Sequence, residues 1–453
     1  MTPPEKRRSK GGPSWFSAVG PGILIAATGI GAGDLMTAGL GGSALGVSIV
    51  WAALAGAFLK WFLNEGIARW QMATNTTLLE GWADRLGEWF QWVFIVYLFI
   101  WSFVVGGAMV NACGVAGSAI VSLHEVPGMR ATAQSVHAFL GIETPLTDAG
   151  VSKIAWGIIH SLVGLVLVWL GGFKVFERLM GVCIGLMFAT VLVTVVLLKP
   201  DVFEIAHRVV EDPMPAGGSK WILGLMGGVG GTVTMLSYGY WIREAHRSGE
   251  SGVRACRIDL AIGYTMTALF GVAMVIIGSR VKISGHGETV ALDIADQLQH
   301  VLGSTGHWIF LIGFWGAVFS SLLGVWQGVP YLFADFVMLR SRKTAEERRA
   351  IDYTRTRAYR AFLLAIALLP LILLWTRVQS VQLSYAVLGA LFLPLLAVTL
   401  LIMNNRTAWV GRAYRSRLPT NIVLVMTLLF FAWVGAKNIA GRFNDTPVTQ
   451  SQK

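Results

Sequence analysis

Long apolar runs alternate with short polar linkers along the whole chain of 453 residues. A helix needs about 20 apolar residues to cross the hydrocarbon of a bilayer. Eleven segments meet this requirement: residues 20–42, 47–71, 91–121, 152–171, 178–199, 221–241, 258–279, 306–328, 358–376, 381–403 and 419–437. The pattern predicts an all-α integral membrane protein with about 11 transmembrane helices in a lipid bilayer.

The composition agrees with this class and excludes several others. The chain is 55% hydrophobic and 13% charged, whereas soluble domains carry about 25% charged residues. The three cysteines have neither metal-ligand nor disulfide spacing, so we expect each to be buried in packing. No nucleophile with a base, phosphate-binding loop or pair of catalytic acids is recognisable in the sequence. We therefore expect no enzyme activity and no cofactor.

The net charge of +11 comes from basic residues in the short linkers. If residues 1–19 form a cytoplasmic tail, 24 of the 36 lysines and arginines lie on the cytoplasmic side. Short cytoplasmic loops of membrane proteins carry such an excess. We expect a multi-pass protein of the plasma membrane, of the bacterial inner-membrane type, with a cytoplasmic N-terminus. The charge is explained by topology and does not indicate nucleic-acid binding.

The first predicted span, residues 20–42, is interrupted by glycines and carries one acid, Asp34, near its middle. Backbone groups freed by a break find no water in hydrocarbon, and a carboxylate at the centre of a span costs about 2.5–3.5 kcal/mol. Transporters use broken helices of this kind to line an ion or substrate site. The alternative is that Asp34 only accepts hydrogen bonds from the freed amides.

The sixth span, residues 221–241, repeats this feature five spans later. It is interrupted by Gly227, Gly228, Gly230 and Gly231. Close helix packing explains one glycine-rich span, whereas two in corresponding positions indicate an inverted-repeat transporter. The expected boundaries are 20–199 for the first repeat, 221–403 for the second, and 404–453 for a peripheral eleventh span and tail.

Several segments also carry a resemblance to a known family. They are GPGILIAATGIGAGD in the first span, KVFERLMGVCIGL and VVLLKPDVFEIA around the fifth, GGVGGTVTMLSYGYW in the sixth, SSLLGVWQGVPYLFADF in the eighth and QLSYAVLGALFLPLLAV in the tenth. In this order they resemble the Nramp-type (natural resistance-associated macrophage protein) divalent metal transporters over spans 1 to 10. The resemblance implies a LeuT-type 5+5 inverted repeat that moves a divalent metal ion by alternating access around helices 1 and 6.

The chain departs from the family pattern at the metal-binding positions. The family's Asp-Pro-Gly-Asn aligns with residues 31–34, its Met-Pro-His with residues 234–236, and its tenth-span glutamine with Ala386. The acids of the family's proton path are absent from the third span, where Asn111 is the strongly polar residue.

The candidate ion site is built from the groups that remain at the two breaks. The expected substrate- and ion-binding residues are Asp34, Gly31, Gly33, Gly231, Thr234 and Ser237. Asp34 and Thr234 are the expected metal ligands, and Met235 is an alternative thioether. Oxygen ligands suit hard ions and a thioether suits softer metals, so the transported ion is expected among Mn, Mg, Fe and Ca.

Other polar residues within the spans are expected to make specific contacts. We expect Asn111 or Tyr238 to reach the site, Glu65 and Arg69 to form an i,i+4 ion pair, and Asp259 and Arg257 to make a helix-end contact. We expect His160 to be a hydrogen-bonded core histidine.

Two other functions remain open from the sequence. A carrier of an amino acid or another small organic solute fits the same fold, because half-helix N-termini hold a carboxylate and Asp34 would then take the ammonium group. A membrane sensor or scaffold that does not transport is the third. The sequence gives neither the proton coupling, the direction of flux nor the oligomeric state.

Overall fold

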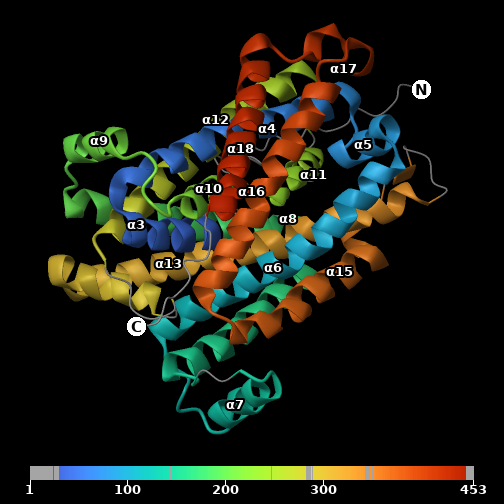
Figure 1. Cartoon of the computed structure of the whole chain (residues 1–453). Helices are drawn as coiled ribbons and strands as arrows, with labels where there is room; N and C mark the ends of the chain where they lie inside the picture. Colours follow the sequence, from blue (N-terminus) through green and yellow to red (C-terminus); the bar gives the residue numbers. More distant parts are fainter. Residues whose placement is uncertain are drawn as a thin grey trace, which may run out of the picture.

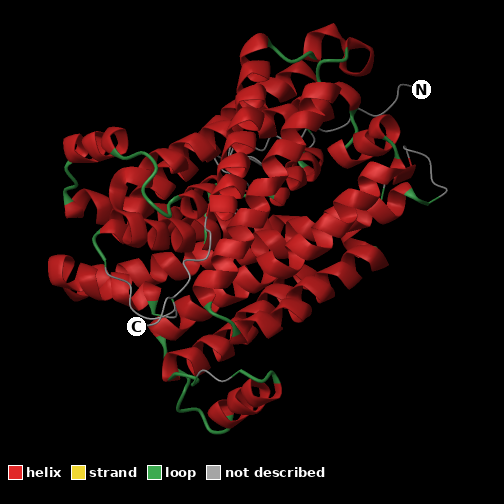
Figure 2. Ribbon diagram, viewed as in Figure 1, coloured by secondary structure: helices red, strands yellow, loops and turns green. Residues whose placement is uncertain are grey.

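The structure is a computed structural model of the whole chain. It describes residue 24 and residues 30–142, 145–245, 247–281, 287, 289–341, 347–348 and 351–444; side chains at 32–34, 171–177, 180, 184, 301–302, 435 and 437–444 lie outside this description. Within these ranges every regular element is a helix (Figure 2). The prediction of an all-α membrane protein is confirmed.

The helices follow the predicted spans closely. In chain order they are η1 (Ala32–Ala38), α3 (Gly39–Leu45), η2 (Gly46–Ile49), α4 (Val50–Thr74), α5 (Leu78–Leu86), α6 (Glu88–Ile120), α7 (Met129–Phe139), α8 (Asp148–Leu198), α9 (Val202–Glu211), α10 (Ser219–Gly228), η3 (Val233–Leu236), α11 (Ser237–Glu244), α12 (Gly249–Ser279), α13 (Val290–Leu339), η4 (Tyr353–Arg355), α15 (Arg357–Leu368), η5 (Leu369–Trp375), α16 (Val378–Met403), α17 (Thr407–Tyr414) and α18 (Leu418–Asn444).

Nine helical stretches of the described chain are long and apolar enough to cross a membrane. One of them, Leu35–Thr74, combines the predicted first and second spans, which η2 joins without a polar linker. The predicted eleventh span appears as the shorter apolar helix Leu418–Val434. The chain is therefore a multi-pass integral membrane protein, and most of the predicted spans are found individually.

The long helix α8 contains two spans that run in opposite directions. His160 accepts a hydrogen bond from Trp315 Nε1 at 2.8 Å, and Cys183 lies against the adjacent residue Gly316. His160 and Cys183 are separated by 23 residues, or about 34 Å along a straight helix. Both contact neighbouring residues of α13, so the segments Asp148–Leu170 and Gly181–Leu198 fold back on each other as the predicted fourth and fifth spans.

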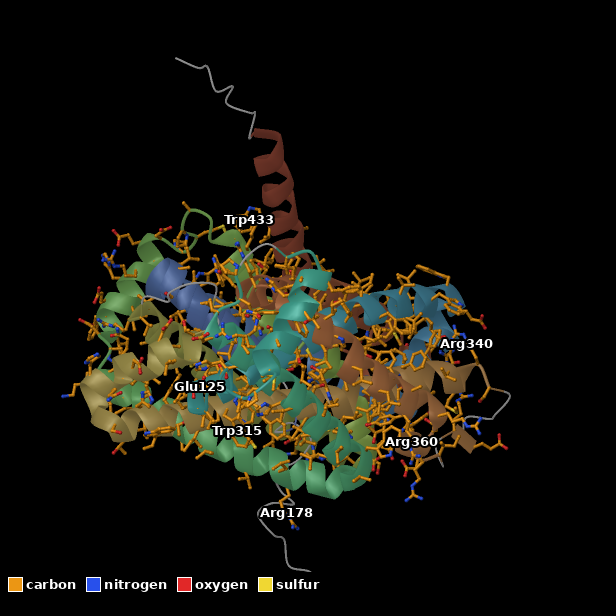
Figure 3. All side chains as sticks on the ribbon, turned by 90° about the horizontal axis from the view of Figure 1, so that it is seen from below. Glu125, Arg178, Trp315, Arg340, Arg360 and Trp433 are labelled. Atoms are coloured by element: carbon orange, nitrogen blue, oxygen red, sulfur yellow. The ribbon has the colours of Figure 1, made fainter. Side chains whose placement is uncertain are left out.

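The linkers gather at two opposite ends of the bundle. At one end Arg243 meets Glu80, and Arg340 meets Gln91; we call this the arginine-rich end. At the other end Trp51 meets Pro213, and Ser43 meets Val281. In Figure 1, α5 and α17 lie toward the arginine-rich end, whereas α7 and α9 lie toward the other end, and Figure 3 shows Arg340 and Arg360 on one side of the molecule. The described linkers that make these contacts therefore lie at the ends where the prediction groups them.

Close glycine contacts hold the first and seventh spans together. A Cβ on Gly42 would overlap the Val275 carbonyl, and a Cβ on Gly278 would overlap the Gly39 backbone. Helices that lack side chains at such positions approach backbone to backbone, which is a common basis of helix association in membranes. Glycine packing, which the sequence offered as an alternative to a helix break, therefore explains α3 against α12.

Candidate functional site

The sixth span is broken in the middle, as its glycines predict. The helix α10 ends with a hydrogen bond from the Val229 amide to the Leu225 carbonyl at 2.9 Å, and η3 begins at Val233. Between them Gly230 and Gly231 both have φ of +78°, a conformation that glycine adopts freely and other residues do not. The break frees the last carbonyls of α10 inside the protein, because this span is almost completely buried.

A buried lysine from the second span meets these carbonyls. Lys60, in α4, is 0% exposed, and its ammonium donates hydrogen bonds to the Gly227 carbonyl at 2.8 Å and to the Val229 carbonyl. Lys60 carries no predicted role. The signal that could have drawn attention to it is a lysine within an apolar span, a rare and costly placement.

The first span is irregular at the predicted place. Ile30 and Gly31 form a turn, and the chain continues as the π-helix η1, which begins with a hydrogen bond from the Leu35 amide to the Gly31 carbonyl at 2.8 Å. Gly33 and Asp34 lie within η1, and their contacts lie outside the described residues. A π-helical turn marks functional sites frequently.

One helix brings the two breaks together. A Cβ on Gly31 would overlap Ser321 Oγ in α13, so the first break packs directly on this helix. In the sixth span, Ser237 Oγ donates to the Gly328 carbonyl of the same helix at 3.0 Å. Ser321 and Gly328 are seven residues apart and lie on one helix face about 10 Å from each other. The predicted site residues Gly31 and Ser237 therefore meet a common surface.

The remaining predicted ligands of the sixth span are buried beside the break. Thr234 is 4% exposed and Met235 is 0% exposed, both within η3. Among the described residues no group of three His, Cys, Asp or Glu side chains is arranged to hold a metal ion. A metal site in this region would therefore use Asp34 together with hydroxyl, carbonyl or thioether groups.

Two hydroxyls that the sequence analysis missed also lie at the breaks. Thr37 in η1 and Thr232 in the broken segment are buried, and their Oγ1 atoms have no hydrogen-bond partner among the described residues. Thr37 lies against Gly224, and Thr232 lies against Gly389. Buried polar atoms are nearly always hydrogen-bonded, so these oxygens are uncommitted groups next to the predicted ligands.

Asn111 and Tyr238, two other candidates for the site, bond to neighbouring helices. The Asn111 amide donates to the carbonyls of Gly107 and Leu373, at 2.9 and 3.0 Å, and joins α6 to η5. The Tyr238 hydroxyl points toward Asp259 at 3.5 Å. These bonds hold neighbouring helices together, and a contact of either side chain with the ion site stays a prediction.

Buried ion pairs sit at the arginine-rich end of α4 and α12. Glu65 pairs with Arg69 at 2.6 Å, which confirms the predicted i,i+4 pair, and also with Arg257 at 2.8 Å. Asp259 pairs with Arg247 at 2.8 Å, so Asp259 and Arg257, both expected to make a helix-end contact, bind different partners. Arg257 instead reaches across to α4.

The arginine-rich end also contains a buried cluster centred on Asp335, which the sequence analysis did not identify. This carboxylate is 0% exposed and accepts hydrogen bonds from Thr77, Tyr240 and Tyr353 at 2.7, 2.6 and 3.2 Å. The cluster ties α13 to the loop before α5, to α11 and to η4. It therefore fixes the second half of the broken sixth span to three other elements.

Glu80 extends this cluster outside the membrane spans. It caps α5 with Thr77 and pairs with Arg243 at 3.3 Å. Burial, together with the negative charge of Asp335, raises the pKa of Glu80 above its ordinary value of 4.5. The cluster therefore contains a carboxyl group that holds its proton more tightly in the folded protein.

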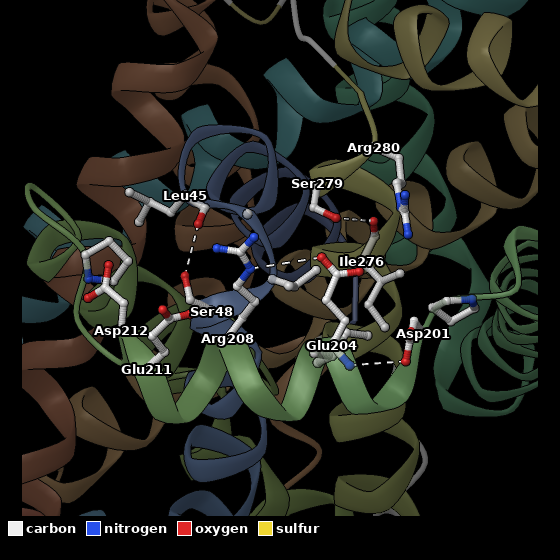
Figure 4. Close-up of a pocket in the computed structure, with 15 residues that line it drawn as sticks. Leu45, Ser48, Asp201, Glu204, Arg208, Glu211, Asp212, Ile276, Ser279 and Arg280 are labelled. Carbon is white, nitrogen blue, oxygen red and sulfur yellow. Dashed lines mark hydrogen bonds and ion pairs between the residues drawn. The ribbon is translucent and has the colours of Figure 1, made fainter.

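Each end of the bundle has a cavity. One of about 540 Å³ lies between α9 and the ends of α3 and α12, where Figure 4 shows Glu204 and Arg208 facing Ile276 and Ser279. A second, of about 750 Å³, opens at the arginine-rich end and reaches Gln327 and Tyr331 of α13. Gln327 is adjacent to Gly328, the residue that binds Ser237, so this cavity approaches the sixth-span break.

Comparisons with known proteins agree with this architecture. A family model described as natural resistance-associated macrophage protein-like matches residues 22–440. No curated protein matches the chain significantly.

Several solved transporter structures share the fold. A mutant of the Eremococcus coleocola manganese transporter superposes with a TM-score of 0.64 at 17% identity, over 98% of this chain and 91% of that one. MhsT in complex with L-phenylalanine gives 0.54 at 15% identity, over 92% and 98%. MHP1, a nucleobase-cation-symport-1 family transporter, gives 0.53 at 11% identity, over 92% and 93%. At these identities the structures show the fold, which is the predicted LeuT type.

Proposed function

This chain belongs to the natural resistance-associated macrophage protein-like family, and on that premise we propose that it moves a divalent metal ion across a membrane by alternating access. The family is one of membrane transporters, so the chain is a secondary transporter and not an enzyme. The similar transporter of Eremococcus coleocola carries manganese, which makes Mn²⁺ the first ion to test.

The observation that carries the proposal is the meeting of both broken spans on α13. Gly31 and Ser237 contact residues two turns apart on this helix. Broken helices that face each other expose carbonyls and half-helix ends, which hold ions in transporters of this architecture. The two halves that carry them, residues 20–199 and 221–403, are proposed to move relative to each other around this point.

The proposed ion site consists of oxygen donors. Asp34 supplies the negative charge, Gly31, Gly33 and Gly231 supply carbonyls, and Thr234 and Ser237 supply hydroxyls, with Met235 as an alternative to Thr234. The buried and uncommitted hydroxyls of Thr37 and Thr232 add two further donors. A set dominated by oxygen suits Mn²⁺, Mg²⁺ or Ca²⁺ better than soft metals, and Fe²⁺ remains within the expected range.

The proposed orientation places the arginine-rich end in the cytoplasm of a plasma membrane of the bacterial inner-membrane type. Linkers rich in arginine stay on the cytoplasmic side during insertion, and those linkers meet at one end of this bundle. The cavity beside Gln327 would then open to the cytoplasm, and the cavity beside α9 to the outside.

Uptake of Mn²⁺ into proteoliposomes tests the function. The wild-type protein is expected to give saturable uptake, and Asp34→Ala to abolish it. Asp84→Ala is the matched control, because Asp84 is an exposed acid in α5 that lines neither cavity, and its removal should leave uptake near the wild-type rate. Saturable uptake of an amino acid without any response to metals would contradict the metal proposal and favour the organic-solute carrier. No uptake of either class would favour the sensor or scaffold.

A further inference from the structure

The ammonium of Lys60 lies at the broken end of α10. Its Nζ donates to two backbone carbonyls there, those of Gly227 and Val229. Gly227 is in the last turn of α10, and Val229 directly follows the helix. These are carbonyls that the end of a helix leaves without an intrahelical partner. The lysine thus satisfies groups that exist only because the span is broken.

The C-terminal end of a half-helix attracts a cation. The aligned peptide dipoles give it a partial negative charge of about half an elementary charge. In transporters of this architecture, unwound carbonyls and the C-terminal ends of half-helices coordinate coupling ions. In this chain a positive charge is already present at that position, and it is covalently part of the protein.

The face of α4 that carries Lys60 fits closely against the break over one turn on either side. Gly56, one turn earlier, lies so close to α10 that a Cβ there would be 3.0 Å from Met226 Cα. Asn64, one turn later, donates to the Tyr264 hydroxyl at 3.1 Å. The Tyr264 ring in turn packs on Gly230. Positions separated by four residues share a helix face, so this face approaches the whole broken segment.

We propose that Lys60 is a tethered cation, which takes the place of a bound ion at the C-terminal end of α10 and holds the break of the sixth span open. A free ion at this end is then unnecessary, and the ion cargo binds on the side of the break that faces the first span. Lys60 would have this role whichever ion or solute the protein transports.

Replacement of the lysine by alanine tests the proposal in the purified full-length protein. Lys60→Ala removes the charge and leaves space for a small ion. Its midpoint of thermal unfolding is expected to fall in choline chloride, because the carbonyls lose their partner inside the protein. Sodium or methylammonium at the same ionic strength is expected to restore at least half of the loss, while choline is too large to enter. The wild-type midpoint should be equal in the three salts.

Two further variants make the outcome decisive. Lys60→Met fills the space without a charge, so its midpoint is expected to be low in all three salts. Lys153→Ala is the matched control: Lys153 is also buried, and its Nζ reaches the Thr376 carbonyl at 3.4 Å, in the linker between η5 and α16 rather than at a break within a span. Its midpoint should not depend on the cation.

Two results would overturn the proposal. One is a midpoint of Lys60→Ala that is the same in choline, sodium and methylammonium; if this variant does not fold, the decision rests on Lys60→Met. The other is a Lys60→Met protein as stable as the wild type, which would show that the side chain acts only through its volume. Because these readouts involve no transport, a failure here differs from a failure of metal uptake.

Discussion

The two broken spans of this protein open their backbones in different ways. The sixth span ends one helix, passes through Gly230 and Gly231 at positive φ, and restarts as η3. The first span turns at Gly31 and widens into the π-helix η1. The sixth break receives a positive charge from Lys60 of a neighbouring helix, whereas the first carries its own acid, Asp34, in the sequence. The charge therefore comes from a neighbouring helix at the sixth break and from the broken span itself at the first.

The comparison also shows what the two breaks share. Both rest on α13, the first through Gly31 at Ser321 and the sixth through Ser237 at Gly328. A single helix thus fixes their separation. Movement of one break relative to the other requires that one of these two contacts be released, which makes both contacts targets for mutation.

The largest effect is expected at the first break. In Gly31→Val, the new side chain would overlap Ser321 Oγ and lie 2.8 Å or less from the Ala317 carbonyl. Overpacking of this kind costs about 1–3 kcal/mol, and the shift of η1 should abolish Mn²⁺ uptake. Uptake and the midpoint of thermal unfolding measure both effects. Gly185→Val is the control, because Gly185 has open space around it. Wild-type uptake and stability of Gly31→Val would contradict the close packing of the first break on α13.

A smaller effect is expected at the sixth break. Gly230→Ala places a side chain at positive φ, which costs about 1–2 kcal/mol, and sets its Cβ 3.0 Å from the Tyr264 ring. Gly128→Ala also places a side chain at positive φ, since Gly128 has φ of +80° in the left-handed helical region, but nothing lies within 4 Å of it. Chemical unfolding should show a larger loss for Gly230→Ala. Equal losses would mean that the break is not tightly enclosed by α12.

A loss of about 1 kcal/mol is expected from Ser237→Ala, which removes one hydrogen bond and leaves the Gly328 carbonyl without this donor. The uptake rate should fall further than this loss of stability alone would explain. The reason is that the contact joins α11 to the helix on which both breaks rest. The measurement is the uptake rate beside the unfolding midpoint. An unchanged rate would show that this contact does not limit the movement.

The smallest effect concerns pH. The folded pKa of Glu80 is raised above 4.5 by burial and by Asp335, so the folded state binds this proton more tightly than the unfolded state. Its contribution to stability is full below pH 4.5 and falls as pH rises through the raised pKa. Glu80→Gln should remove this part of the pH dependence in thermal unfolding. The same slope in both proteins would contradict the shift.

The sequence predicted the parts of the structure that depend on local pattern. The spans follow from runs of apolar residues, the sixth-span break from paired glycines, and the pair of Glu65 and Arg69 from their spacing on one helix. The fold class, the family and its transport function agree with the comparisons. The ligand assignments at Asp34, Thr234 and Met235 stay predictions.

The contacts that the sequence missed depend on the arrangement of distant helices. Lys60 binds backbone carbonyls 167 and 169 residues away, and backbone atoms leave no mark in a sequence. Asp335 collects hydroxyls from three other elements. Asn111 was assigned to the site because it is polar, but the packing of α6 on η5 turns it toward Leu373.

Direct binding of Mn²⁺ tests the central claim, that a divalent ion binds at Asp34 between the two breaks. Titration of the purified wild-type protein with Mn²⁺ should show one ion per chain, and Asp34→Asn, which keeps the side chain's shape and removes its charge, should bind at least about tenfold more weakly, a loss of about 1.4 kcal/mol. Equal affinity of the two proteins, or no binding by a folded wild type, would contradict the account.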